Sequence, residues 1–164
     1  MKLAFILDPL EHLKAYKDSS VAMMRAAATR GHAVFAIDCA TLAWRRPESA
    51  RPGGVFAVAA HLHMQPDNHD WFREIGRDRI PLSDFDAVVM RRDPPFDNEY
   101  LTATWLLERA AQAGARVFNH PRSIRDHSEK LAITEFPQFT PATRVARAAA
   151  DINAFIDAHG DTIL

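Results

Sequence analysis

Short apolar segments alternate with amphipathic helical segments over the first 120 residues, and this alternation leaves few folds open to the chain. Four apolar segments have the length of strands, and they are residues 1–8, 33–38, 87–91 and 116–119. Helices are expected between them at residues 17–30 and 98–113, followed by Gly31 and Gly114 as helix stops. Repeated strand–helix–strand units favour parallel strands joined by right-handed crossovers, so we predict a doubly wound, mainly parallel α/β sheet with flanking helices.

Other stretches of this region fit the alternation less simply. Arg51-Pro52-Gly53-Gly54 predicts a turn, which makes residues 55–64 one arm of a hairpin. Residues 70–79 are expected to form a short helix or a loop. A further helix is expected from Arg122 to Thr134, and it would carry Asp126, Glu129 and Lys130.

The last part of the chain departs from the pattern. Residues 136–141 contain two prolines and are interpreted as a linker. A strand is expected at 143–146, a helix at 151–158 with Ile152, Phe155 and Ile156 facing inward, and a new strand from Thr162. An apolar strand at the end of a chain leaves its edge unpaired. We therefore expect a truncated chain, with one complete domain at 1–121 and a connecting helix, a linker and the start of a second domain at 122–164.

Composition excludes several classes of protein. The 20 basic and 21 acidic residues nearly balance, which argues against a nucleic-acid partner bound through its phosphates. No apolar run approaches the 18 to 20 residues of a membrane span, and the first residues lack the features of a signal peptide. Cys39 is the only cysteine, so no internal disulfide can form, and a cytoplasmic location is expected.

The most informative polar cluster follows the strand at 87–91. Arg91, Arg92 and Asp93 stand between this strand and a double proline, and Asp97 can cap the next helix. Ligands bind at the carboxyl ends of strands in open α/β sheets, so two cations and a carboxylate here suggest a small, multiply charged ligand. The alternative is a surface ion-pair cluster without function. A shift of one residue would exchange Arg91 and Arg92 between the two faces of the sheet.

Two further segments allow a functional and a structural interpretation. Asp18, Ser19 and Ser20 stand at a helix start, where they can cap the helix or help to bind an anion. The cap is the favoured alternative. Lys130 lies among other charged residues, so it is either part of a solvated helix face or a phosphate-binding point charge.

Other candidate chemistries find less support. His61 and His63 would share one face of a strand, but no cysteine or nearby carboxylate completes a metal site with them. Cys39 has no evident activator and is interpreted as a small buried hydrophobe. The sequence contains no GxGxxG, GxxxxGK[ST] or GxSxG motif, so ordinary dinucleotide binding and serine hydrolysis lack their usual signatures.

Taken together and in order, several segments resemble those of the bacterial glutathione synthetases, which are ATP-grasp ligases. The most specific is Val89-Met90-Arg91-Arg92-Asp93-Pro94-Pro95-Phe96-Asp97. The others are the start of the chain through Asp8-Pro9, Lys17-Asp18-Ser19-Ser20, Leu107-Glu108-Arg109-Ala110, Asn119-His120-Pro121, Ile124-Arg125-Asp126, Glu129-Lys130-Leu131 and Thr140-Pro141. Residues 43–79 match weakly.

The resemblance implies a Rossmann-like, pre-ATP-grasp domain that lies on the substrate side of a ligase. It implies that ATP and Mg²⁺ activate γ-glutamylcysteine as an acyl phosphate, which the amine of glycine then attacks. Lys130 matches a lysine that contacts ATP phosphates, and Asp18, Ser19, Ser20, Arg91 and Asp93 match positions on the peptide-substrate side. The magnesium ligands of the family would lie beyond Leu164, so residues 1–164 are expected to be inactive alone. A homo-oligomer is expected for the full-length enzyme.

Two alternatives remain open at this point. The chain could belong to another ATP-grasp amino-acid ligase, which would share the domain order and Lys130. It could also be a stand-alone module for small-molecule binding or oligomerisation, with no catalytic half.

Overall fold

The computed structural model describes residues 1–49, 53–128 and 130–163. The chain forms two compact units, Met1–Asp126 and His127–Leu164, which are treated separately below. Within the described residues, no helix is long and apolar enough to cross a membrane.

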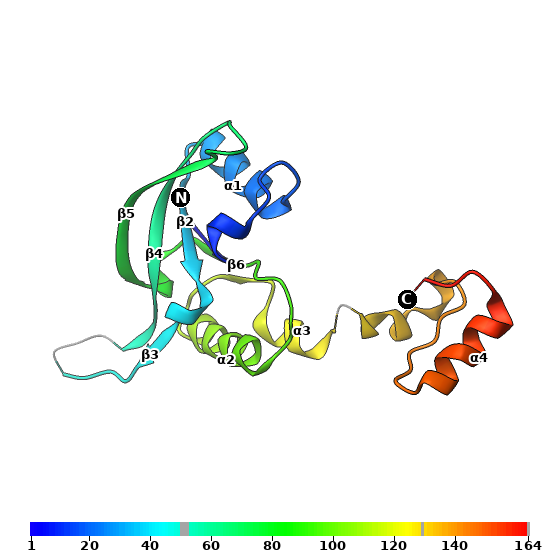
Figure 1. Ribbon diagram of the computed structural model, residues 1–164. Helices are drawn as coiled ribbons and strands as arrows, with labels where there is room; N and C mark the ends of the chain where they lie inside the picture. Colours follow the sequence, from blue (N-terminus) through cyan, green and yellow to red (C-terminus); the bar gives the residue numbers. More distant parts are fainter. Residues whose placement is uncertain (50–52, 129, 164) are drawn as a thin grey trace. The chain divides into compact units, whose positions relative to one another are not determined.

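The first unit is built on a curled, mixed sheet with flanking helices (Figure 1). Its parallel half has the strand order β2-β1-β6-β7, formed by β1 (Lys2–Leu7), β2 (Ala33–Asp38), β6 (Ala87–Met90) and β7 (Val117–Phe118). The helices that connect these strands are α1 (Ser19–Thr29) and α2 (Asn98–Gln112), and α3 (Pro121–Asp126) follows β7. The predicted α/β class and its parallel strands are therefore confirmed.

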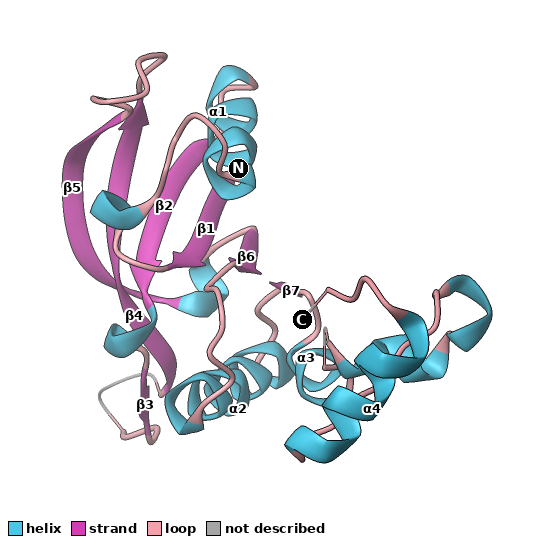
Figure 2. Ribbon diagram, turned by 45° about the vertical axis from the view of Figure 1, so that its right-hand side comes forward, coloured by secondary structure: helices cyan, strands magenta, loops and turns pink. Residues whose placement is uncertain are grey.

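Three antiparallel strands extend the sheet beyond β2 (Figure 2). They are β3 (Ala43–Arg45), β4 (Gly54–Met64) and β5 (Phe72–Pro81), and β4 pairs with the other two and with β2. The predicted hairpin arm at 55–64 is confirmed, whereas the helix or loop predicted at 70–79 is wrong. Most of β5 is exposed on both faces, so the strand lacks the apolar alternation that marks a half-buried strand. Arg51 and Pro52 of the predicted turn lie outside the described residues.

Alternation along the central strands produces one core on each face of the sheet. Ala4 and Ile6 of β1 pack in the cluster that contains Leu107 of α2. Phe5 and Leu7 pack in the opposite cluster, which contains Val21 and Met24 of α1 together with Ala60, Leu62 and Trp71. These central strands are buried on both sides, since α1 covers one face of the sheet and α2 covers the other.

Local capping fixes where the two long helices begin and end. The Asp18 carboxylate accepts hydrogen bonds from the backbone of Ser20 and Val21, and Asp97 accepts one from Tyr100. Gly31 and Gly114 adopt positive φ angles of 76° and 101° directly beyond the helix ends. The predicted helix boundaries and glycine stops are confirmed.

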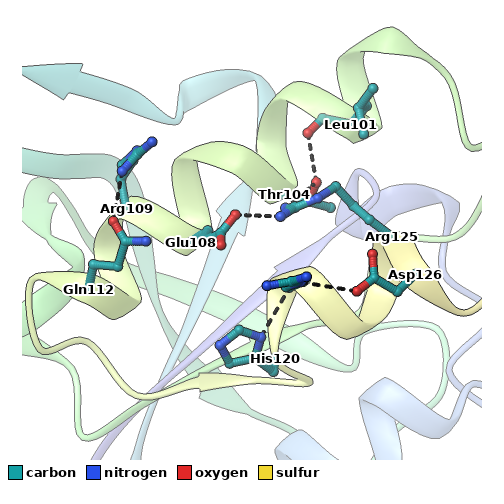
Figure 3. A network of polar contacts seen from close by, with 9 residues as sticks. Leu101, Thr104, Glu108, Arg109, Gln112, His120, Arg125 and Asp126 are labelled. Atoms are coloured by element: carbon teal, nitrogen blue, oxygen red, sulfur yellow. Dashed lines mark hydrogen bonds and ion pairs between the residues drawn. The ribbon is translucent and has the colours of Figure 1, made fainter.

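The long helix predicted from Arg122 to Thr134 is wrong, because α3 ends at Asp126. Arg125 in α3 donates to Glu108 and to the Thr104 hydroxyl of α2 (Figure 3). These bonds hold α3 against α2, and α3 is part of the first compact unit. Lys130 comes after the helix, directly before the short 3₁₀ helix η4 (Leu131–Glu135), and Glu129 lies outside the described residues.

The second unit contains η4, a second 3₁₀ turn η5 (Pro137–Phe139) and α4 (Ala149–His159). The helix predicted at 151–158 is confirmed, and its stop at Gly160 has a φ angle of 72°. The strands predicted at 143–146 and from Thr162 are wrong, since the described residues of both segments are irregular, while Leu164 is not described. Ile152, Phe155 and Ile156 are only half-buried, and no described residue of this unit is fully buried. A strand needs a neighbour and a core, and residues 130–163 offer neither.

Candidate functional site

The candidate site lies where β6 ends and α1 begins. The Arg91 side chain donates from Nε to the Ser20 hydroxyl at 3.1 Å and from Nη2 to the Ser19 hydroxyl at 2.8 Å. The partners are more than 70 residues apart in sequence, and they meet because β1 and β6 are parallel neighbours in the sheet. Three of the six residues singled out from the sequence are thus brought into direct contact.

Asp18 has a structural role at this place. Its carboxylate oxygen Oδ1 accepts from the backbone N–H groups of Ser20 at 2.7 Å and Val21 at 3.0 Å. These are the donors that a bound anion would use at the start of α1. The geometry therefore favours the helix cap over a free anion site for Asp18. The Ser20 side chain is buried, so its hydroxyl is a fixed acceptor for Arg91.

Asp93 is held through its backbone rather than its carboxylate. Its N–H donates to Oδ2 of Asp8 at 3.0 Å, while the Asp93 side chain is exposed. Asp8 follows β1 at the same sheet edge, and it ties the segment after β6 to the end of β1. Asp8 was not among the site residues singled out from the sequence. Asp8 could have been identified from its position directly after an apolar strand, because the same rule identified Arg91.

Arg92 extends to the opposite side of the sheet from Arg91. Its Nε lies 3.9 Å from Oδ1 of Asp8, and its Nη2 lies 3.9 Å from Oε2 of Glu99 in α2. A cavity of about 380 Å³ lies on this side, lined by Cys39, Ala40, Leu42, Arg92, Asn98, Glu99, Thr102, Ala103 and Leu106. Burial raises the pKa of the Cys39 thiol above its ordinary value, and the neighbouring Arg92 opposes that rise. Cys39 is buried, as predicted.

The remaining candidates are Lys130 and the two histidines of β4. Lys130 is exposed and belongs to the second unit. His61 is half-buried and stacks on Phe35 with ring centroids 4.6 Å apart, whereas His63 is exposed. Over the described residues, no group of three or more His, Cys, Asp or Glu side chains gathers closely enough to hold a metal ion.

The fold and the site together define a class of domain. It is an α/β domain with a cation at its strand ends, hydroxyls at the adjoining helix start, and none of the usual nucleotide-binding glycine motifs. The chain matches the family described as prokaryotic glutathione synthetase, N-terminal domain, over residues 1–125, and it belongs to that family. The resemblance inferred from the sequence is confirmed.

Curated relatives are similar along the whole chain. It is 49% identical to the glutathione synthetase of Ralstonia nicotianae over 163 residues, covering 99% of the chain and 48% of the relative. It is 51% identical to that of Nitrosomonas europaea, with 100% of the chain and 50% of the relative covered. It is 40% identical to that of Vibrio parahaemolyticus, again with 100% and 50% covered. The chain thus spans about half the length of the curated relatives it matches.

Proposed function

We propose that this chain is the amino-terminal, substrate-side part of an ATP-dependent ligase that joins γ-glutamylcysteine to glycine to make glutathione. The observation that carries this proposal is the Arg91 guanidinium held by the Ser19 and Ser20 hydroxyls at the strand ends. Its support is the family to which residues 1–125 belong and the name shared by the curated relatives.

In this proposal Arg91 binds a carboxylate of γ-glutamylcysteine. A guanidinium has five N–H donors, and the two bonds to serine hydroxyls fix its plane while leaving other donors for a ligand. Charge-assisted bonds of this kind contribute about 1.5–3 kcal/mol each. Asp93 follows Arg91 by two residues and has an exposed carboxylate. We propose that this carboxylate binds the ammonium group of the substrate. Asp18 is proposed to act indirectly, by holding Ser19 and Ser20 at the helix start.

ATP, when bound, would supply the phosphoryl group that activates the substrate carboxylate. Lys130 is proposed to contact its phosphates, and an exposed lysine fits this role because the ammonium group is a compact charge on a flexible stem. Mg²⁺ would neutralise phosphate charge. Its protein ligands are proposed to lie outside residues 1–164, in the half of the relatives that this chain does not cover.

Three further statements belong to the same proposal. Residues 1–164 alone are proposed not to catalyse ligation, because the curated relatives are about twice as long. The full-length protein is proposed to be a homo-oligomer. A cytoplasmic location is proposed because the only cysteine, Cys39, is buried as a free thiol.

The proposal is tested by measuring ADP release and glutathione formation by the full-length protein with ATP, Mg²⁺, γ-glutamylcysteine and glycine. We expect both products from the full-length protein and neither from residues 1–164. ADP release with another amino acid but not with glycine would assign a different ligase. If no amino acid supports ADP release, the ligase proposal is refuted and a binding module is the remaining alternative.

A further inference from the structure

One edge of the sheet is formed by β5, a strand of ten residues. It pairs along one side with β4 and with no other strand of the described chain, and it is outermost beside β4 in both views (Figures 1 and 2). Most of its side chains are exposed, including Ile75 at 51%. A long unpaired strand edge is a template for pairing with another strand.

A β-bulge sets which side chains of β5 share a face. Ile75 is the extra residue, because Glu74 pairs with Leu62 while Gly76 pairs with His61. Beyond the bulge, Arg77 pairs with Ala60, which packs in the same core as Leu62. Glu74 and Arg77 therefore lie on the α1 side of the sheet, and their side chains form an ion pair there.

Arg73 and Asp78 lie on the other face of β5. Asp78 pairs with Ala59, which packs in the α2-side core, and Arg73 pairs with His63, which is two residues from His61 on the same face. Within the described residues, neither side chain makes a hydrogen bond or an ion pair. Arg73 and Asp78 on this face, like Glu74 and Arg77 on the other, thus lie at mirrored distances from the bulge, and Arg79 adds a second basic residue to the α1 side.

This arrangement of charges is complementary to itself. If two β5 strands pair antiparallel with Ile75 opposite Gly76 of the second copy, Arg73 faces Asp78 and Glu74 faces Arg77, and symmetry repeats both pairs. The paired residues also match in face, which follows from the bulge. Neighbouring registers are disfavoured: one places Arg73 opposite Arg79 and Glu74 opposite Asp78, and the other places Arg73 opposite Arg77. Opposite charges across strands stabilise a sheet and like charges destabilise it.

We propose that the free edge of β5 pairs with β5 of a second copy of this chain, in the register that places Ile75 opposite Gly76. The result is a two-fold symmetric dimer with one continuous sheet, in which both copies present the same surface. Two strand edges alone bury less area than a standard interface, so association is expected at micromolar concentrations or above. Charges on an edge strand can also prevent such pairing. In that case the chain would stay monomeric, and the experiment below distinguishes the two outcomes.

The test uses Arg73→Asp and Asp78→Arg, because these changes place like charges opposite each other without removing a polar contact within the described residues. Dissociation constants of the chain and each variant would be measured by sedimentation equilibrium. Each substitution changes two symmetry-related pairs, so we expect dimerisation to weaken by roughly tenfold or more. Arg116→Asp, the same charge change at an exposed position in another part of the unit, is the control and is expected to dimerise like the parent. Circular dichroism would establish that each variant is folded.

Mixing the two variants gives the decisive result. Arg73→Asp and Asp78→Arg chains restore complementary charges in a heterodimer, and the chain carrying both changes restores them in a homodimer. We expect both to associate with close to the parent affinity. A parent chain that stays monomeric at several hundred micromolar, unchanged dimerisation of the single variants, or failure of the mixture to associate would each overturn the proposal.

Discussion

Arg91 and Arg92 are neighbours in sequence, but their side chains lie on opposite sides of the sheet. Arg91 donates to Ser19 and Ser20 at the start of α1, while Arg92 lies 3.9 Å from Glu99 in α2. Successive residues along an extended segment point to opposite faces, and this alternation continues from β6 into the two arginines. The pair therefore supplies one cation to each side of the same sheet edge.

The role proposed for Arg91 predicts that its loss affects KM for the peptide substrate and not KM for ATP in the full-length protein. If Arg91 binds the peptide substrate as proposed, replacing it with alanine removes a charge-assisted hydrogen bond and is expected to raise KM for γ-glutamylcysteine by roughly 10- to 100-fold. KM for ATP is expected to change little. Steady-state kinetics with each substrate varied in turn would measure both constants. Arg122→Ala, which removes an exposed ion pair with Asp126, is the control. A defect confined to ATP would show that Arg91 does not face the peptide substrate.

The Asp18 cap predicts a loss of stability. Asp18→Ala leaves the backbone N–H groups of Ser20 and Val21 without their carboxylate acceptor, so the free energy of unfolding should fall by about 0.5–2 kcal/mol. Asp18→Asn keeps an acceptor oxygen and should lose less. Urea denaturation followed by circular dichroism measures both values. Equal losses for the two variants would mean that the negative charge, rather than the cap geometry, stabilises the helix.

The contact between α2 and α3 predicts an energetic coupling. The side chains of Arg125 and Glu108 are only 15% and 25% exposed, so their ion pair is largely shielded from water (Figure 3). A double-mutant cycle with Arg125→Ala and Glu108→Ala should give a coupling energy of about 1–3 kcal/mol. The exposed pair Arg122–Asp126, with side-chain exposures of 71% and 54%, should give less than about 1 kcal/mol in the same cycle. Similar coupling for both pairs would contradict the role of burial.

The environment of Cys39 predicts slow thiol chemistry. Because burial raises the pKa of this thiol in the folded chain, the folded state holds its proton more tightly than the unfolded state does. Iodoacetamide at pH 8 should therefore alkylate Cys39 at least about tenfold more slowly in the folded chain than in urea, as followed by mass spectrometry.

The raised pKa of Cys39 also determines how its contribution to the free energy of unfolding changes with pH. The stabilisation from the protonated thiol is fully present below the unfolded pKa, and it is lost as pH rises from there through the raised folded pKa. The stability difference between the parent and Cys39→Ala should accordingly shrink above about pH 9. A difference that grows with pH would show that Arg92 favours the thiolate more than burial disfavours it.

The sequence by itself determined the parallel strands, the long helices and their ends. Continuous apolar runs, the caps Asp18 and Asp97, and the glycines that follow the helices act over a few residues, so they can be recognised without the fold. The rule that ligands bind at strand ends also identified Arg91, Ser19 and Ser20 as candidates.

Only the tertiary structure decided the relations between distant segments. It showed that Arg91, not Arg92, reaches Ser19 and Ser20, and that Asp8 holds the backbone of Asp93. It also showed β5 as a strand and ended α3 at Asp126. An edge strand exposed on both faces carries no apolar period, and strand register and helix packing depend on partners far away in the chain. Local sequence patterns do not contain that information.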